Sequence, residues 1–239
     1  LGQSSHKALE NARKEVALLM NAEPSEIIFT GCGSESDNMA LRGYLHSPQA
    51  KGKKHMITST IEHHAILHTA QALEREGYEV TYLKPDRTGH ISAGQVAEAL
   101  REDTVLVSVM LVNNETGCLF PVADIARLLK ERGSRALLHC DAVQGFLKVP
   151  CAPAGWGVDL MSLSAHKIGG PKGIGALYIR PDLRNLRPLL AGGGQEEGLR
   201  SGTEATAQIA GFAKAVALRQ EGLEEKLAHM ARIKAYCRE

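Results

Sequence analysis

The sequence predicts an α/β fold in which a mostly parallel, seven-stranded sheet is sandwiched between helices. Three observations lead to it: β-rich apolar runs alternate with helical runs, the apolar runs are nearly continuous, and polar residues collect where several of them end. Continuous apolar strands that alternate with helices are typical of a parallel sheet buried on both faces. A chain of 239 residues is long enough to bury such a core.

The expected elements follow one another in a βαβ order. An amphipathic helix comes first, and its apolar face is formed by Ala8, Ala12, Val16, Leu19 and Met20. Strands are expected at residues 26–30, 55–59, 78–83, 104–112, 136–144, 158–164 and 174–180. Helices are expected between them at residues 37–45, 64–77, 92–102 and 122–133. A glycine-rich loop at 191–204 and a final helical pattern from residue 223 complete the chain.

The charge balance and the lack of long apolar runs exclude several function classes. The chain has 28 basic and 27 acidic residues, so it has no polybasic surface for nucleic acid or a membrane. No apolar run is long enough to cross a membrane, and the N-terminus lacks the apolar centre of a signal peptide. We therefore expect a cytoplasmic protein. The five cysteines have no disulfide-like spacing, which favours a reducing compartment, and we expect them to be mostly buried apolar residues.

Polar residues follow the expected strands at the sheet edge where ligands bind in α/β proteins. They are Ser34, Glu62, His63, Asn113, Asn114, Asp141, Gln144, Ser164, His166 and Lys167. The segment TGCGSESDN at 30–38 would direct the backbone N–H groups near Gly33 and the Ser34 hydroxyl toward an anion. The alternative is a tight turn in which Ser34 caps the helix. The segment matches neither common nucleotide-binding loop.

Three kinds of side chain at this edge each allow a functional and a structural interpretation. Asp141 follows an apolar strand and needs a cationic partner, which is either an arginine or the protonated nitrogen of a bound heterocycle. His63 either begins a helix without chemical purpose or contacts a ligand. His64 and His68 have the spacing of a helical metal-ligand pair, but no third ligand is recognisable, so we predict no metal site.

Lys167 lies in SAHKIGGPKG, on a glycine-rich turn directly after an apolar strand. A lysine becomes nucleophilic when it is desolvated or held near other cations, and it then forms Schiff bases with aldehydes such as pyridoxal phosphate. An isolated turn lysine would be exposed and inert. An amine, an anion site and a strand-end acid at one edge, however, meet the three requirements of that cofactor.

Six segments resemble, in the same order, the motifs of the cysteine desulfurases of the NifS/IscS group, which are fold-type I pyridoxal-phosphate enzymes of aminotransferase class V. The segments are FTGCGSESDN, IEHHAIL, VNNETG, HCDAVQ, SAHKIGGPKGIGALY and GGGQEEGLRSGTE. They cover nearly the whole chain. Cys32 and Ser34 differ from the glycine and threonine common in the family, although Ser34 keeps the hydroxyl.

The resemblance implies a role for each site residue. Lys167 would bind the cofactor covalently and transfer the proton at the substrate α-carbon, and His63 would stack on the ring. Asp141 would pair with the pyridine nitrogen, Gln144 with the ring hydroxyl oxygen, and Asn114 would lie near the substrate carboxylate. The phosphate would be held by the N–H groups near Gly33 and by Ser34, Ser164 and His166. Thr203 would reach the phosphate in the neighbouring subunit, so the resemblance implies a homodimer.

The resemblance also implies a domain organisation and an activity. Residues 1–222 would form the cofactor-binding large domain, and 223–239 would start the linker helix to a C-terminal domain. We expect that domain, with the cysteine that accepts sulfur as a persulfide, to lie beyond this chain, and a short N-terminal arm to precede Leu1; Cys237 is a poor candidate for the sulfur-accepting cysteine. The intact enzyme would convert L-cysteine to L-alanine and pass sulfur to an acceptor protein.

Two other functions remain open at this stage. A selenocysteine lyase or another class V enzyme, such as an aminotransferase, would share Lys167 and Asp141, and the C-terminal segment would distinguish them. A non-catalytic scaffold paralogue would not need to bind the cofactor at all.

Overall fold

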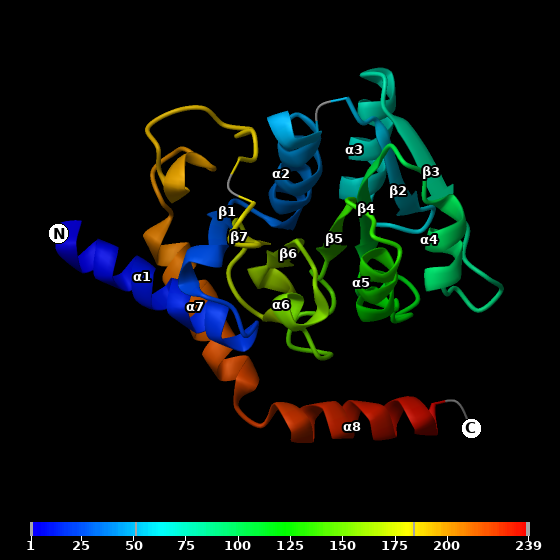
Figure 1. Cartoon of the computed structure of the whole chain (residues 1–239). Coiled ribbons are helices and arrows are strands. Elements are labelled where there is room, and N and C mark those ends of the chain that lie inside the picture. The colour runs from blue at the N-terminus through cyan, green and yellow to red at the C-terminus, as the bar shows by residue number, and fades with distance from the viewer. Residues whose placement is uncertain (1, 51, 184, 238–239) are drawn as a thin grey trace.

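The computed structural model describes residues 2–50, 52–183 and 185–237, and it confirms the predicted α/β architecture (Figure 1). The sheet has seven strands in the order β1-β7-β6-β5-β4-β2-β3. They are β1 (Ile27–Thr30), β2 (His55–Ser59), β3 (Glu79–Leu83), β4 (Thr104–Met110), β5 (Leu137–Asp141), β6 (Leu160–Ser164) and β7 (Gly175–Ile179). Strand β7 runs antiparallel to its neighbours β1 and β6, whereas the other pairs are parallel.

Helices cover both faces of the sheet (Figure 1). They are α1 (Gly2–Leu19), α2 (Gly33–Leu45), α3 (His64–Arg75), α4 (Ala93–Ala99), α5 (Val122–Glu131), α6 (Pro153–Trp156), α7 (Thr206–Gln220) and α8 (Leu223–Tyr236). Buried residues of α2 and α3 share one core, and those of α1, α4, α5 and α7 share the other. Short 3-10 helices include η3 (Ala165–Ile168) and η4 (Glu196–Gly198).

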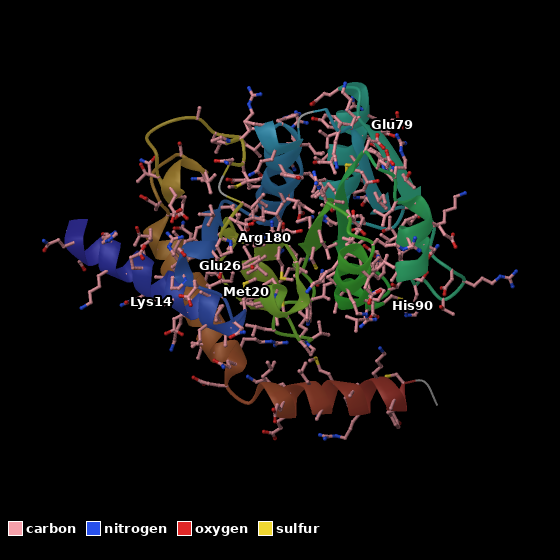
Figure 2. All side chains as sticks on the ribbon, in the orientation of Figure 1. Lys14, Met20, Glu26, Glu79, His90 and Arg180 are labelled. Carbon is pink, nitrogen blue, oxygen red and sulfur yellow. The ribbon has the colours of Figure 1, made fainter. Side chains whose placement is uncertain are left out.

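The nearly continuous apolar strands follow from this sandwich. Successive side chains of a strand point to opposite faces, so Ile28 packs in the α2–α3 core while Ile27 and Phe29 pack in the other. All residues of β2 and β4 are buried, and side chains fill the space on both sides of the sheet (Figure 2). Met20 is fully buried, whereas Glu79 on the edge strand β3 is exposed.

The structure differs from the expected elements at the start of α2 and in two helices that were not expected, α6 and α7. Helix α2 starts at Gly33, four residues before the expected position, because the segment GSES continues the helix rather than forming a turn. Helix α7, which was not expected, packs along α1 (Figure 1). Helix α8 begins at Leu223 and has no buried residue. The domain boundary between residues 222 and 223 stays a prediction. Leu1 and residues 238–239 lie outside the described residues.

The expectation that the cysteines are mostly buried is wrong. All five are free, but only Cys140 is buried, and Cys32 and Cys237 are exposed. Cys32 lies at the start of α2 and lines a pocket, and Cys237 is the C-cap of α8, a helix with no buried residue. Within the described residues, no helix is long and apolar enough to cross a membrane.

Candidate functional site

A pocket of about 350 Å³ lies where strands β4, β5 and β6 end and α2 begins. Nine of the ten predicted site residues line it: Gly33, Ser34, His63, Asn114, Asp141, Gln144, Ser164, His166 and Lys167. The sheet therefore brings together side chains that are more than 130 positions apart in the sequence, as expected for the carboxyl edge of parallel strands.

The start of α2 forms one wall of this pocket. A Cβ atom at Gly33 would lie 2.8 Å from Val143 Cγ2 and 3.3 Å from Ser164 Cβ, so the helix start is tightly packed on the segment after β5 and on the last residue of β6. The first N–H groups of a helix have no partner inside it and carry its positive end. Ser34 is exposed at this end; the interpretation of Ser34 as the cap is wrong, since Cys32 is the N-cap residue.

Ser164, His166 and Lys167 come from the end of β6 and from η3. Ser164 Oγ and His166 Nδ1 are 2.8 Å apart. Burial, and then the charges of Lys167, Lys172 and Lys148, lower the pKa of His166. Gly169 ends η3 with a φ of 86°, a conformation that favours glycine. This wall therefore offers a hydroxyl, an imidazole and an amine to an anion.

Lys167 is exposed to the pocket. The amine is therefore not desolvated in this structure. Lys167 acts electrostatically on both Lys148 and His166. Its amine is accessible to a ligand in the pocket.

Asp141 is the last residue of β5 and is 6% exposed. Its Oδ1 accepts a hydrogen bond of 2.9 Å from the N–H of Val143. Burial raises the pKa of Asp141, while that hydrogen bond and the charges of His63 and Lys167 oppose the rise. Among the ion pairs of the described residues, none joins Asp141 to an arginine. The acid is therefore available to a cationic group in the pocket.

Three further predicted residues complete the walls. His63 is the N-cap of α3, and its Nδ1 accepts a hydrogen bond of 3.1 Å from the N–H of Ala65. Gln144 Oε1 accepts one of 3.1 Å from Lys148 Nζ. Asn114 donates one of 2.7 Å to Glu115 Oε1. The rings of His64 and His68 stack with centroids 5.1 Å apart, and in the described part of the chain no cluster of three or more metal-binding side chains includes them.

Thr203 is the predicted site residue that this chain does not bring into the pocket. It lies beyond η4 and lines a separate pocket of about 100 Å³ with Gly31, Gly202 and Arg200. Arg200 Nε is held at 2.8 Å from Glu35 Oε1, on the first turn of α2. The loop is thereby attached to the outer side of α2.

Sequence reasoning missed several residues of the pocket. Cys32, Asp37, Met110, Val112, Glu115 and Val143 also line it. Asp37 follows Gly33 by four residues, so it projects from the same face of α2. That spacing is a signal that could have identified Asp37 once α2 was known to start at Gly33.

Known proteins resemble this chain over nearly its full length. Residues 1–239 match the family model described as "Aminotransferase class-V". The chain is 50% identical over 236 residues to the cysteine desulfurase IscS of Pseudomonas putida, a match that covers 98% of this chain and 57% of that protein.

Two solved structures have the same fold. A "NifS-like protein" superimposes with a TM-score of 0.94 at 40% identity, over 98% of this chain and 64% of that one. A structure titled "SspA in complex with cysteine" has a TM-score of 0.86 at 42% identity, over 96% of this chain and 67% of that one. The chain spans somewhat more than half the length of the curated relatives it matches.

Proposed function

Because the chain belongs to the class V aminotransferase family, we propose that it is the cofactor-binding part of a pyridoxal-phosphate-dependent cysteine desulfurase. Residues 1–222 would form the cofactor-binding domain, and residues 223–239 would start the linker helix to a C-terminal domain. The observation that carries this proposal is the convergence of an amine, an anion-binding wall and a buried acid on one pocket of about 350 Å³.

The side chains present fit this cofactor. Gly33, which has no side chain of its own, lines the pocket at the start of α2 beside Ser34, Ser164 and His166, so a phosphate bound there would face the first backbone N–H groups of that helix. At Asp141 the carboxylate would pair with the protonated ring nitrogen. When bound, pyridoxal phosphate supplies an aldehyde that amines bind covalently and a ring that withdraws electrons from the substrate α-carbon.

Side chains of this chain would hold the cofactor, orient the substrate and transfer its proton. Lys167 would bind the cofactor through Nζ, and once the substrate amine takes its place it would accept and return the proton at the substrate α-carbon. His63 would lie against the ring, Gln144 would donate to the ring oxygen, and Asn114 would orient the substrate carboxylate. Asp141 would keep the ring nitrogen protonated, which favours loss of that proton.

The names of the relatives support L-cysteine as the substrate. Its carbon–sulfur bond would break as the sulfur passes to a cysteine thiolate, leaving L-alanine and a persulfide for a sulfur-acceptor protein in iron–sulfur cluster or thiolated-cofactor synthesis. We also propose a cytoplasmic homodimer, in which Thr203 contacts the phosphate of the neighbouring site. The location of Thr203 outside its own chain's pocket is compatible with such a role.

Proton exchange at the substrate α-carbon tests this function. The chain is loaded with pyridoxal phosphate and incubated with L-cysteine in D₂O, and deuterium at the α-carbon is measured by NMR. We expect exchange in the parent and in Lys172→Ala, which removes an exposed lysine five residues from Lys167, and a loss of at least about 100-fold in Lys167→Ala. Equal exchange in Lys167→Ala and Lys172→Ala would contradict the role of Lys167.

A further inference from the structure

Three carboxyl groups are buried near one another, and two of them, Asp37 and Asp141, line the pocket. Asp37 on α2, Glu62 after β2 and Asp141 at the end of β5 are 1%, 5% and 6% exposed. Each of Asp37 and Glu62 has a buried oxygen, Oδ1 and Oε2 respectively, that has no hydrogen-bond partner. Three adjacent negative charges in a buried site would repel one another strongly, so at least one of these groups must carry a proton.

Among the described residues, no positively charged side chain pairs with Asp37. The groups that face it are Asp141, Glu62, the Cys32 thiol, Ser162 and His139. His139 Nε2 lies 3.8 Å from Asp37 Oδ1. His139 is fully buried between the hydroxyls of Ser108, at 2.9 Å, and Ser162, at 3.0 Å. Burial lowers the pKa of His139 to about 3, so at neutral pH it offers Asp37 no positive charge.

Glu62 has a similar environment. Its Oε1 accepts hydrogen bonds from Ser59 Oγ at 2.7 Å and from the N–H of Met110 at 3.2 Å. Both donors are neutral, and no ion pair of the described residues includes Glu62. An unpartnered oxygen costs less in a neutral acid than in a carboxylate. Asp141, by contrast, has the Val143 N–H and the charges of His63 and Lys167 to stabilise its ionised form.

We propose that Asp37 and Glu62 both hold a proton at neutral pH and act as neutral positioning residues, which leave Asp141 as the single negative charge at the base of the pocket. The protonation of Asp37 and Glu62 is a property of the unloaded chain, and only its consequence for a bound ring nitrogen rests on the proposed function. Ionisation of either acid would add a like charge beside Asp141 and favour its protonation.

Infrared spectroscopy of the chain without cofactor tests the proposal, because a protonated carboxyl has a carbonyl band that a carboxylate lacks. At pH 7 we expect Asp37→Asn and Glu62→Gln each to lower the intensity of this band by the contribution of one protonated carboxyl group. Asp124→Asn, which changes an exposed acid on α5 that pairs with Arg127, should leave the band unchanged. A band that is absent in the parent, or that persists undiminished in Asp37→Asn, would overturn the proposal for Asp37.

Two further measurements keep the test independent of variant folding and of cofactor binding. In the unsubstituted chain, ¹³C labelling of aspartate carboxyls should shift part of the protonated band; an unshifted band would exclude a protonated Asp37.

With pyridoxal phosphate added, Asp37→Asn should keep the parent's pH profile of visible absorption, because asparagine imitates the neutral acid, whereas Asp141→Asn should shift it. Equal shifts in both variants would overturn the positioning role. A failure to bind cofactor would contradict the proposed function and leave the infrared result decisive for the protons.

Discussion

Glu62 is buried without a counter-charge, and this makes stability depend on pH. Burial raises the pKa of Glu62 to about 8 from the ordinary value of 4.5. Between these values the folded chain keeps a proton that the unfolded chain releases, so the stabilising contribution is complete below pH 4.5 and is lost as the pH rises to 8. The loss is on the order of a few kcal/mol.

Substitution Glu62→Gln should remove this part of the pH dependence. We expect the difference in free energy of unfolding between Glu62→Gln and the parent to shift progressively in favour of the variant from pH 5 to pH 8. Urea denaturation at several pH values measures it, with the exposed Glu98→Gln on α4 as the control. A difference that is constant over this range would mean that Glu62 ionises normally.

The residues of the candidate site differ in how far the sequence reveals them. The shared pocket of Lys167, His63 and Asp141 could be predicted because strand ends in a parallel sheet meet at one edge, whereas their cofactor-binding roles stay a prediction. The protonation of Asp37 and Glu62 could not be predicted from the sequence, because it depends on whether folding places a cation beside them. The exposure of Lys167 also depends on tertiary packing.

Among the elements, strand β7 packs closely against the start of α2 and against β6 at one residue, Gly175. A Cβ atom at Gly175 would lie 2.7 Å from both the carbonyl carbon of Cys32 and the oxygen of Leu163, and these backbone atoms cannot move without displacing the start of α2 or strand β6. Gly175→Ala should therefore destabilise the chain by about 1–3 kcal/mol.

The comparison variant is Gly94→Ala on α4, where the nearest atom, Ser92 Oγ, would be 3.6 Å from the new Cβ. There alanine should stabilise by up to about 1 kcal/mol, because it favours the helix over the unfolded chain. Urea denaturation of both variants measures these changes. Equal stabilities of Gly175→Ala and Gly94→Ala would show that the packing between β7 and α2 is not tight.

The strands could be predicted nearly to their ends, whereas the helices were harder to predict. Strands β2 and β4 begin at the residues that the apolar runs indicate. Helix α7 was missed although Ile209, Phe212 and Val216 have the spacing of a helical stripe, because apolar residues such as the exposed Leu218 also lie outside that stripe and weaken the pattern. The early start of α2 was missed because Gly33 and the serines after it are typical of turns as well as of helix starts.

For the whole molecule, parallel strands and their flanking helices place nine predicted residues in one pocket, and the family match covers residues 1–239. Thr203 is the exception, because its loop is attached to the outside of α2 through the Arg200–Glu35 ion pair. The pattern of strands and helices in the sequence identifies which residues of one chain share a sheet edge. It does not identify contacts between subunits, so the role of Thr203 stays a prediction.

Borohydride reduction of the chain with pyridoxal phosphate, followed by peptide mass mapping, tests most directly whether the pocket holds this cofactor on Lys167. We expect a visible absorption band that the reduction abolishes and a stable adduct on the peptide that contains Lys167, with none in Lys167→Ala. An adduct that persists in Lys167→Ala, or that is found on Lys148 or Lys172 instead, would contradict the assignment of Lys167 and with it the proposed function of this pocket.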